Sequence, residues 1–588
     1  MLFWDHKDRY ILMKLNTKGH TTIFHLTDLP GWTLWICASV LSGWFLSCNS
    51  TSNVPPHQEI VTTPEQMNEK VPDIIKSIVD HIAENGGRMD SNVVLQLTVL
   101  PYLYDKSKEA KWSKEEKLLP IADSVMTFIQ NSMLYGLFPE DYHFKNISSI
   151  KDRIGSDSVA RKDAVLWAKA DVLLTDAMIG IIKDVKLGRL QKDSLTLRTD
   201  SVLSNEFYAE QVQKILQSNS VATVIDSLEP ILKGYHELKA GIKGFLDTAQ
   251  FKDYTYVPYP VYDSMGFLHA LPRRLFEEGL LDSSYASKDS VEVSRAVKKF
   301  QQKKKLKSDG KAGNETIRTL NLSDKDKFFR IALSLDKYKM LPAKMPNKYL
   351  WVNLAGYYLQ LWQGDSVEIY SKVVCGKPLT RTPELSSSIS EMITYPQWSV
   401  PQSIIAKEFL PELKKDPGYL EKKGFSLLDE KNEEVDPYFI DWSKYTKGIP
   451  YKIIQGSGDD NALGVMKFNF PNKYAVYLHD TNQRYLFGQS VRSLSHGCVR
   501  VQEWEKLSNF ILQNDSTYID SLGHGSFTKS DSVQQWLLRK EKHYIPVRDR
   551  IPLFIRYFTC EGRNGRIIFF DDMYGEDHRL KEKYFATK

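Results

Sequence analysis

A short segment near the carboxyl end of the sequence carries side chains suited to covalent chemistry. Its reactive or permissive positions are Ser495, His496, Gly497, Cys498 and Arg500. Gly497 allows the backbone to turn sharply and to approach a substrate closely. A helix is predicted over 502–513, and the positive end of its dipole would give the Cys498 thiol thiolate character. The segment is therefore a candidate for nucleophilic catalysis.

A histidine nineteen residues upstream of the cysteine could serve as its base. In the predicted strand 473–480, Ala475, Tyr477 and His479 fall on one face, whereas the alternate residues are apolar and suit a core. A thiol nucleophile needs a base or imidazolium within hydrogen-bond reach, and His479 can supply it if the chain brings it to Cys498. From these residues alone, a buried structural cysteine remains the competing interpretation. A metal site is disfavoured because close-spaced pairs of Cys or His ligands are absent from the sequence.

The composition is that of a multidomain globular chain. Its 588 residues carry a net charge of only +5, with 42% apolar and 26% charged residues. A balance this even argues against a nucleic-acid partner, and wholesale disorder or a polytopic membrane protein is excluded. Five cysteines are too few for a disulfide framework in a chain of this length.

The amino terminus has the pattern of an export signal. Residues 32–48 are apolar or small, follow two lysines, carry no charge and end at Cys48. The run before Cys48 resembles a bacterial lipoprotein box, in which the cysteine is lipidated, and a polar tether follows. An uncleaved single-pass anchor is the alternative, and Met13 is a possible start. Either interpretation predicts a periplasmic, membrane-anchored chain, with Cys37 inside the signal segment.

Two helical regions are expected before residue 325. Residues 49–260 are predicted to form a helical scaffold, with a long helix over 165–190 that could end at Gly188. In residues 261–325, a helix over 290–306 is followed by an Asp-Gly turn and a short helix over 313–320. This second unit resembles the small helical peptidoglycan-binding module, which implies contact with the cell wall.

The pattern changes to strands from about residue 348, within a domain expected over residues 326–588. Residues 348–377 alternate and are broken at Gly356 and Gly364, which predicts consecutive hairpins. Further strands are expected at 451–458, 465–470 and 551–572. The polar stretch at about 402–447 interrupts this pattern and is predicted to be an inserted cap. The fold class is therefore multidomain α+β, ending in a mainly β domain.

This last domain resembles the L,D-transpeptidase (YkuD-type) catalytic domain. The resemblance rests on His479, a spacer of fifteen residues, and the run Ser-His-Gly-Cys-Val-Arg at 495–500. Supporting stretches are VVCGKPLTRTP (373–383), YPQWSVP (395–401), NALGVMKFNFPN (461–472), YLHDT (477–481) and FFDDMYGED (569–577). The order of anchor, helical scaffold, wall-binding module and catalytic domain also resembles the large periplasmic subclass.

The resemblance implies a role for each position of the motif. Cys498 would attack a tetrapeptide stem, release D-Ala and form a thioester, which an amine of a second stem would convert into a 3→3 cross-link. His479 would be the acid/base. Backbone N–H groups at Gly497 and Cys498, helped by Tyr477, would stabilise the oxyanion. Arg500 would hold a stem carboxylate unless it forms a structural ion pair. Ser495 would shape the loop, with His496 structural or contributing.

Other functions stay open from the sequence. They are an L,D-carboxypeptidase, an enzyme that attaches a protein to peptidoglycan, and a non-catalytic peptidoglycan-binding anchor. The expected partners are peptidoglycan stem peptides and, through the amino terminus, a membrane; no cofactor, metal or nucleic acid is expected. A reactive thiol facing such a site would also be acylated by carbapenems. Cys375 and Cys560 are expected to be buried thiols, or a disulfide in an oxidising compartment.

Overall fold

The computed structural model describes residues 55–585, with gaps at 91, 94–95, 108, 201, 219, 262 and 517–529. The predicted export segment at 32–48, including Cys37 and Cys48, and the possible start at Met13 lie outside the described residues. Within the described ranges, no helix combines the length and the apolarity that crossing a bilayer requires.

The first half of the described chain is helical. Its helices are α2 (Pro64–Glu84), α3 (Val99–Ser107), α4 (Pro120–Gln130), α5 (Phe144–Ser156), α6 (Ser158–Arg161), α7 (Ala164–Leu187), α8 (Asn205–Gln217), α9 (Val221–Asp226) and α10 (Lys233–Leu246), with 3-10 turns η1 (Ser132–Tyr135) and η2 (Pro139–Tyr142). Two short hairpins, β1 (Arg88–Met89) with β2 (Asn92–Val93) and β3 (Ser113–Lys114) with β4 (Lys117–Leu118), connect them.

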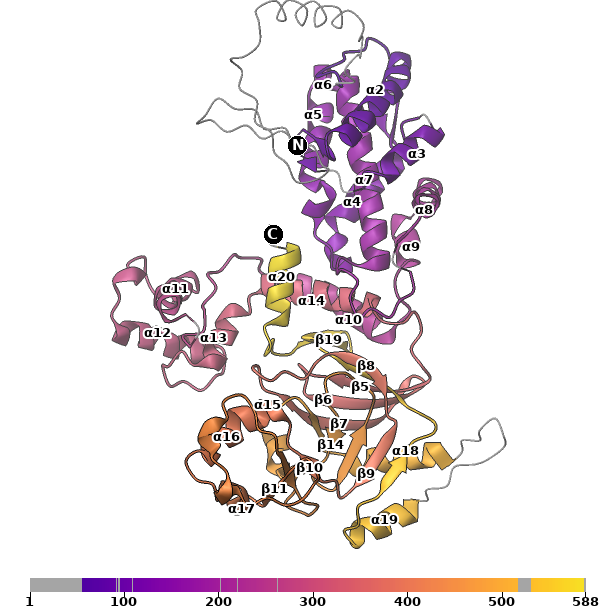
Figure 1. Cartoon of the computed structure of the whole chain (residues 1–588). Coiled ribbons are helices and arrows are strands. Elements are labelled where there is room, and N and C mark those ends of the chain that lie inside the picture. Colours follow the sequence, from indigo (N-terminus) through magenta and orange to yellow (C-terminus); the bar gives the residue numbers. More distant parts are fainter. Residues whose placement is uncertain are drawn as a thin grey trace, which may run out of the picture. The chain divides into compact units, whose positions relative to one another are not determined.

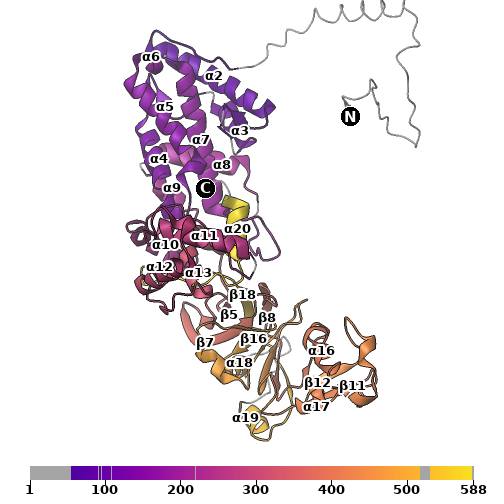
Figure 2. The ribbon, with the colours of Figure 1, turned by 90° about the vertical axis from the view of Figure 1, so that its left-hand side faces the viewer.

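Helix α7 is the centre of this helical region (Figures 1 and 2). It begins where the Asp163 side chain accepts from the Val165 N–H, and it ends at Gly188, whose φ of 77° favours glycine. Apolar side chains occur around its whole circumference and are buried, as expected of a helix enclosed by others. Asp171 in α7 accepts from the Tyr104 hydroxyl at 2.7 Å and so ties α3 to it.

A small helical module follows with its own apolar core. Its helices are α11 (Ser264–Glu277), α12 (Ser290–Lys303) and α13 (Asn314–Asn321), with η3 (Tyr285–Ser287). Leu275, Phe300 and Ile317 are buried together, one from each helix. The Gln301 side chain accepts from the Gly310 N–H and donates to Thr316, which fixes the Asp-Gly turn. Helix α14 (Asp324–Lys339) then leads to the sheet domain.

The sheet domain is built on an eleven-stranded mixed sheet. Its order is β17-β9-β13-β14-β16-β7-β6-β5-β18-β8, and β15 also pairs with β7. The strands are β5 (Lys348–Asn353), β6 (Tyr358–Gln363), β7 (Ser366–Gly376), β8 (Leu385–Ser388), β9 (Glu391–Thr394), β13 (Met466–Asn469), β14 (Leu478–His479), β15 (Ser493–Ser495), β16 (Val499–Val501), β17 (Tyr544–Pro546) and β18 (Pro552–Arg556).

The two faces of this sheet pack differently. One face buries Leu350, Leu359, Leu478 and Val499 in a core that includes side chains of α18 (Trp504–Ser516) and α19 (Ser530–Leu538). On the other face, α10 and α14 cover the β5, β6 and β18 end, where Trp351 is buried among them. The hairpin β19 (Cys560–Arg563) with β20 (Arg566–Phe569) and the last helix α20 (Glu576–Phe585) complete this side.

Residues 398–455 leave the main sheet and form a separate substructure (orange in Figure 1). A three-stranded sheet of β10 (Trp398–Ser399), β12 (Lys452–Gln455) and β11 (Phe425–Leu428) carries α15 (Gln402–Ile404), the π-helix η4 (Ile405–Phe409), α16 (Leu410–Leu413) and α17 (Tyr419–Lys422), then η5 (Pro437–Phe439) and η6 (Trp442–Lys444). Ile405, Leu413 and Ile453 are fully buried in its own core.

The predicted fold class is confirmed: helical regions precede a mainly β carboxyl-terminal domain. The hairpins predicted over 348–377 form as β5, β6 and β7. The strand predicted over 473–480 is wrong in extent, because β14 contains only Leu478 and His479. Ala475 has a φ of 53°, which an extended strand cannot accommodate. The domain boundaries stay predictions.

Gly562 lets α10 approach β19 at backbone distance. A Cβ at this position would lie 2.0 Å from the Glu237 carbonyl carbon, so Gly562→Ala must push the helix away. We expect a loss of about 1–3 kcal/mol, seen as a lower thermal unfolding midpoint. The matched control is Gly244→Ala in the same helix, where a Cβ meets nothing within 4 Å and should stabilise slightly. Equal midpoints for the two variants would contradict this packing.

Candidate active site

Strand register brings the predicted site residues to one face of the sheet. In the parallel pair β14–β16, Leu478 pairs with Val499 and His479 with Arg500. Leu478 and Val499 point into the core, so the neighbouring side chains point away from it. By alternation, Tyr477, His479, Cys498 and Arg500 therefore lie on the other side of the two segments, and Tyr477 and Cys498 also pack against the edge of this core. The sequence predicted one face for Ala475, Tyr477 and His479, but Ala475 lies outside β14 in a left-handed conformation. The structure adds the pairing of β14 with the strand that follows Cys498.

The loop before Cys498 is fixed by hydroxyl groups. The Ser495 hydroxyl donates to the Cys498 carbonyl at 2.6 Å and accepts from the Gly497 N–H at 3.1 Å. Thr382, whose importance the sequence did not reveal, donates to the Gly497 carbonyl at 2.7 Å. Gly497 has a φ of 126°, a conformation that favours glycine. These contacts hold the thiol at the start of β16.

The same contacts correct one prediction about the oxyanion. Gly497 was expected to offer its N–H to a developing negative charge, but that N–H is engaged by Ser495. Ser495 does not accept from the Cys498 N–H, so this N–H is the remaining backbone candidate for donating to the oxyanion. The Tyr477 hydroxyl lies within hydrogen-bond contact of the Cys498 sulfur and is the second donor at this position.

The Cys498 thiol is half-buried and is not activated by a helix. Burial raises the pKa of Cys498, while the hydrogen bonds from Tyr477 and the charges of Lys467 and Arg500 oppose that rise. The expected thiolate character from a helix dipole is wrong, because Cys498 precedes a strand and α18 begins only at Trp504. The resting side chain is therefore a thiol, which has to lose its proton as it attacks.

His479 is buried and uncharged. Burial, reinforced by the positive charge of Arg500, lowers the pKa of His479 to about 3. Its ring lies edge-on to Tyr477 with 5.6 Å between centroids. Its buried Nδ1 forms no full hydrogen bond, although backbone groups of Asp480 and Leu463 favour a proton on the ring and partly oppose the lowering of its pKa. A neutral imidazole with an unsatisfied buried nitrogen can take up a proton during a reaction, and such orphaned groups are costly without a role.

Arg500 is held by neutral groups. Its Nη1 donates to the Thr481 hydroxyl at 3.2 Å and to the Gln483 amide oxygen at 2.9 Å. Its Nε is buried without a partner. Among the described residues no carboxylate forms an ion pair with it, so the structural ion pair considered from the sequence is not found. A guanidinium without an ion-pair partner can bind the carboxylate of a ligand by donating two N–H groups from its planar fork.

His496 points toward the inserted substructure. Its Nε2 lies 2.5 Å from the Glu408 carboxylate in η4. The insert also lies close to Tyr477 through Trp398 in β10, whose side chain opposes the rise that burial causes in the pKa of Tyr477. The loop and the tyrosine that borders the thiol are thus both in contact with residues 398–455, as a cap over a reactive group would require.

Lys467 is a further charged residue at the thiol that sequence reasoning did not single out. It pairs with His479 across β13 and β14, and its Nζ lies 4.0 Å from the centroid of the Tyr477 ring. Burial lowers the pKa of Lys467, and the Cys498 charge opposes this shift. Its ammonium group is therefore placed to stabilise a thiolate. A lysine in a strand carries no motif, so only the register reveals it.

We expect Lys467→Met to make the thiol less acidic. Loss of the nearby positive charge should raise the Cys498 pKa further, and thiolate-dependent alkylation below that pKa should slow about three- to ten-fold. The measurement is the pH dependence of iodoacetamide labelling at Cys498. Lys473→Met removes an exposed lysine from the same connection and is the control. An unchanged pH profile in Lys467→Met would remove Lys467 from the site.

The other described cysteines are inert. Cys375 and Cys560 are free and buried, so the disulfide considered for them is not formed. Burial raises the pKa of each to about 12. Over the described ranges, no cluster of three or more His, Cys, Asp or Glu side chains is arranged to hold a metal ion.

Comparison with known families assigns three parts of the chain. Residues 347–519 match the L,D-transpeptidase catalytic domain, residues 99–241 match the scaffold domain, and residues 273–320 match the putative peptidoglycan binding domain. The chain therefore contains an L,D-transpeptidase catalytic domain, joined to a scaffold domain and a peptidoglycan-binding domain. This confirms the resemblance drawn from the motif at 479–500.

Two individual proteins are similar to parts of the chain. A protein described as a putative L,D-transpeptidase from Haemophilus influenzae is 33% identical over 251 residues, which are 43% of this chain and 48% of that protein. The match thus spans about half the length of that relative. A crystal structure of an L,D-transpeptidase from Stackebrandtia nassauensis is 16% identical and covers 45% of this chain and 90% of its own, with a TM-score of 0.15, too low to support an argument.

Proposed function

We propose that this protein is a cell-wall L,D-transpeptidase that forms 3→3 cross-links between peptidoglycan tetrapeptide stems. The Cys498 sulfur attacks the carbonyl between the third stem residue and the terminal D-Ala. A carbon–sulfur bond forms, the peptide carbon–nitrogen bond breaks, and D-Ala leaves with its amine. An amine on a second stem then attacks the thioester, forms the cross-link and releases the thiol.

The neutral state of His479 defines its part in these steps. Since its pKa lies far below neutrality, the imidazole can accept the Cys498 proton as sulfur attacks and then pass it to the leaving D-Ala amine. Tyr477 and the Cys498 N–H are the candidate donors to the oxyanion. Each such donor contributes typically about 10²–10³ in rate. Arg500 is the candidate for holding a carboxylate of the stem.

One observation carries this proposal. A thiol, a neutral buried imidazole with an unpartnered nitrogen, and an arginine without an ion pair lie side by side on adjacent strands of one sheet face. Buried polar groups without partners are uncommon in folded proteins, and two of them, His479 Nδ1 and Arg500 Nε, lie on neighbouring strands here. The peptidoglycan-binding domain earlier in the chain independently supports a cell-wall substrate.

Incubation of the full chain with a disaccharide-tetrapeptide tests the proposal. Analysis of the products by liquid chromatography and mass spectrometry should show a cross-linked dimer that has lost one D-Ala. Tripeptide without dimer would make the protein an L,D-carboxypeptidase, because water rather than an amine then resolves the thioester. A product that appears only when a lysine-bearing protein is added would indicate attachment of protein to peptidoglycan. If no product forms but the protein still binds peptidoglycan, the protein would be a non-catalytic anchor.

We extend the proposal to location and inhibition. The chain would act in the periplasm, anchored through a lipid on Cys48, and labelling with a radioactive fatty acid should be lost in Cys48→Ala. Persisting membrane attachment without lipid would indicate a single-pass anchor instead. A carbapenem should acylate Cys498, increasing the protein mass by that of the drug. Absence of this adduct at high drug excess would contradict a reactive thiol facing an acyl site.

A further inference from the structure

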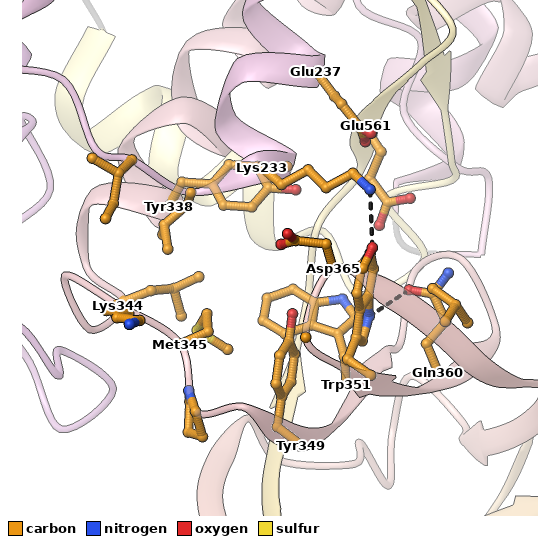
Figure 3. A pocket seen from close by; sticks show the side chains of 18 of the residues that line it. Lys233, Glu237, Tyr338, Lys344, Met345, Tyr349, Trp351, Gln360, Asp365 and Glu561 are labelled. Carbon is orange, nitrogen blue, oxygen red and sulfur yellow. Dashed lines mark hydrogen bonds between the residues drawn. The ribbon is translucent and has the colours of Figure 1, made fainter.

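A cavity of about 610 Å³ lies away from the thiol, between α10 and strands β5 and β6. Figure 3 shows Tyr349, Trp351, Gln360 and Asp365 around this hollow, with Lys233 from α10 on its opposite side. Its lining combines aromatic rings with polar groups, which is typical of ligand sites that need both contact area and orientation.

The aromatic rings form one wall of the cavity. Tyr349 and Trp362 lie parallel, with 6.0 Å between ring centroids and 3° between planes. Both are only half-buried, and Trp351 beside them is almost fully covered. The face of an aromatic ring carries negative charge, so it attracts cations such as Lys233, whose Nζ lies 5.6 Å from the centroid of Trp362, and also weakly positive C–H groups. The axial hydrogens of a pyranose ring are such groups.

The polar groups are placed for hydroxyl and amide partners. The Trp362 indole N–H donates to the Gln360 side-chain oxygen at 3.2 Å, which fixes that amide, and Lys233 donates to the Asp365 backbone carbonyl at 3.1 Å. The Asp365 side chain lies at the centre of the view in Figure 3. Burial and Asp365 raise the pKa of Tyr349 to about 12, so its hydroxyl stays a neutral donor.

The charges of the lining cancel. Lys233, Lys344 and Arg563 are cationic, and Glu237, Asp365 and Glu561 are anionic. Glu561 is also already bonded to Asn353 at 2.7 Å and to Arg563 at 3.3 Å. A pocket without net charge gives no advantage to a charged stem peptide. It favours an uncharged ligand rich in hydroxyl or amide groups.

The cavity lies on the same sheet face as the thiol. Trp351 pairs with Gln360, and Gln360 pairs with Tyr370 on β7. Along β7, Val374 shares that face with Tyr370, and Val374 pairs with Arg500. A chain bound in the cavity would therefore occupy the side of the sheet on which Cys498 reacts.

We propose that this cavity is a saccharide-binding site that holds N-acetylhexosamine units of a glycan strand against Tyr349 and Trp362. The inference deepens the proposed function, since it assigns a place to the sugar chain that carries the stems. Gln360 and Asp365 would bond the hydroxyl and acetamido groups, and the aromatic wall would cover the ring.

The test measures binding at the cavity itself. The full chain bearing Cys498→Ala is labelled with 5-fluorotryptophan and titrated with a tetramer of β-1,4-linked N-acetylglucosamine. The Trp362 fluorine resonance, assigned by Trp362→Phe, should shift with saturation. Tyr349→Ala and Gln360→Ala should each need about ten-fold more oligosaccharide for the same shift. Tyr544→Ala, an exposed tyrosine on β17, should need no more than the parent.

Two outcomes would overturn the site. One is an unmoved Trp362 resonance while other tryptophan signals respond, which would place the sugar elsewhere on the chain. The other is a shift produced by a free stem peptide and not by the tetrasaccharide. Because Cys498→Ala does not turn over, either result is independent of whether the native chain is a transpeptidase.

Discussion

Replacing Cys498 by alanine should abolish release of D-Ala from a tetrapeptide stem. The sulfur is the only side-chain group at this position that can form the acyl intermediate, so its loss removes the covalent route rather than slowing one step. Enzymes that lose their nucleophile fall by about 10⁴–10⁶ in turnover, and we expect at least the lower figure. The measurement is D-Ala release by a coupled amino-acid oxidase assay.

A second cysteine provides the matched control for this variant. Cys560 is buried and donates to the Ser334 hydroxyl, far along the chain from the motif. Cys560→Ala should keep turnover within a few-fold of the native chain, although it costs some stability. Turnover that survives in Cys498→Ala, or that disappears in both variants, would show that Cys498 is not the nucleophile.

Replacing His479 by glutamine should lower turnover by about 10²–10⁴, the usual contribution of a general base. Glutamine keeps a polar side chain at the same strand position but cannot take up the thiol proton. The residual rate of His479→Gln should rise with pH as hydroxide deprotonates Cys498, whose pKa burial has raised. The kinetic readout is turnover from pH 6 to pH 10. A variant with the native rate and profile would mean that another group accepts the proton.

The same substitution should change the response of stability to acid. The pKa of His479 is about 3 in the folded chain and about 6.5 in the unfolded chain, so between these values the unfolded state binds more protons. Native stability therefore falls as the pH drops below about 6.5. At pH 4.5 this one group costs about 2–3 kcal/mol relative to pH 7.

Urea unfolding followed by the fluorescence of the catalytic domain measures this effect. His479→Gln carries no proton in either state, so its midpoint should fall less than the native midpoint between pH 7 and pH 4.5. The quantity compared is the difference between the urea midpoints of the two proteins at each pH, because the carboxylates titrate equally in both proteins. Parallel losses in the two proteins would contradict a buried neutral histidine.

Local patterns in the sequence were sufficient for much of the fold. The long apolar helix appeared as α7, and the alternation broken at Gly356 and Gly364 appeared as the strands β5, β6 and β7. The motif also singled out Cys498 and His479, which the pairing of β14 with β16 brings to neighbouring segments; their roles stay predictions. These features depend on residues close together in sequence, where periodicity and turn residues are informative.

Features that depend on pairing between distant segments were missed. Lys467 reaches the thiol through the register of β13 with β14, and Thr382 reaches Gly497 across more than a hundred residues. The helix expected to activate Cys498 follows a strand instead, so the supposed electrostatic effect has no source. The cavity beside Trp351 combines α10 with strands more than a hundred residues later. Such contacts leave no local signal.

In the proposed reaction, Cys498 becomes acylated by a stem peptide. The most direct test of this step is mass spectrometry of the protein during turnover of a disaccharide-tetrapeptide. The reaction of the full chain is quenched in acid, the protein is digested, and the masses of its peptides are measured. We expect a hydroxylamine-sensitive adduct of the disaccharide-tripeptide on the peptide that contains Cys498, and none in Cys498→Ala. An adduct on another residue, or cross-linked product without any adduct on this thiol, would contradict it.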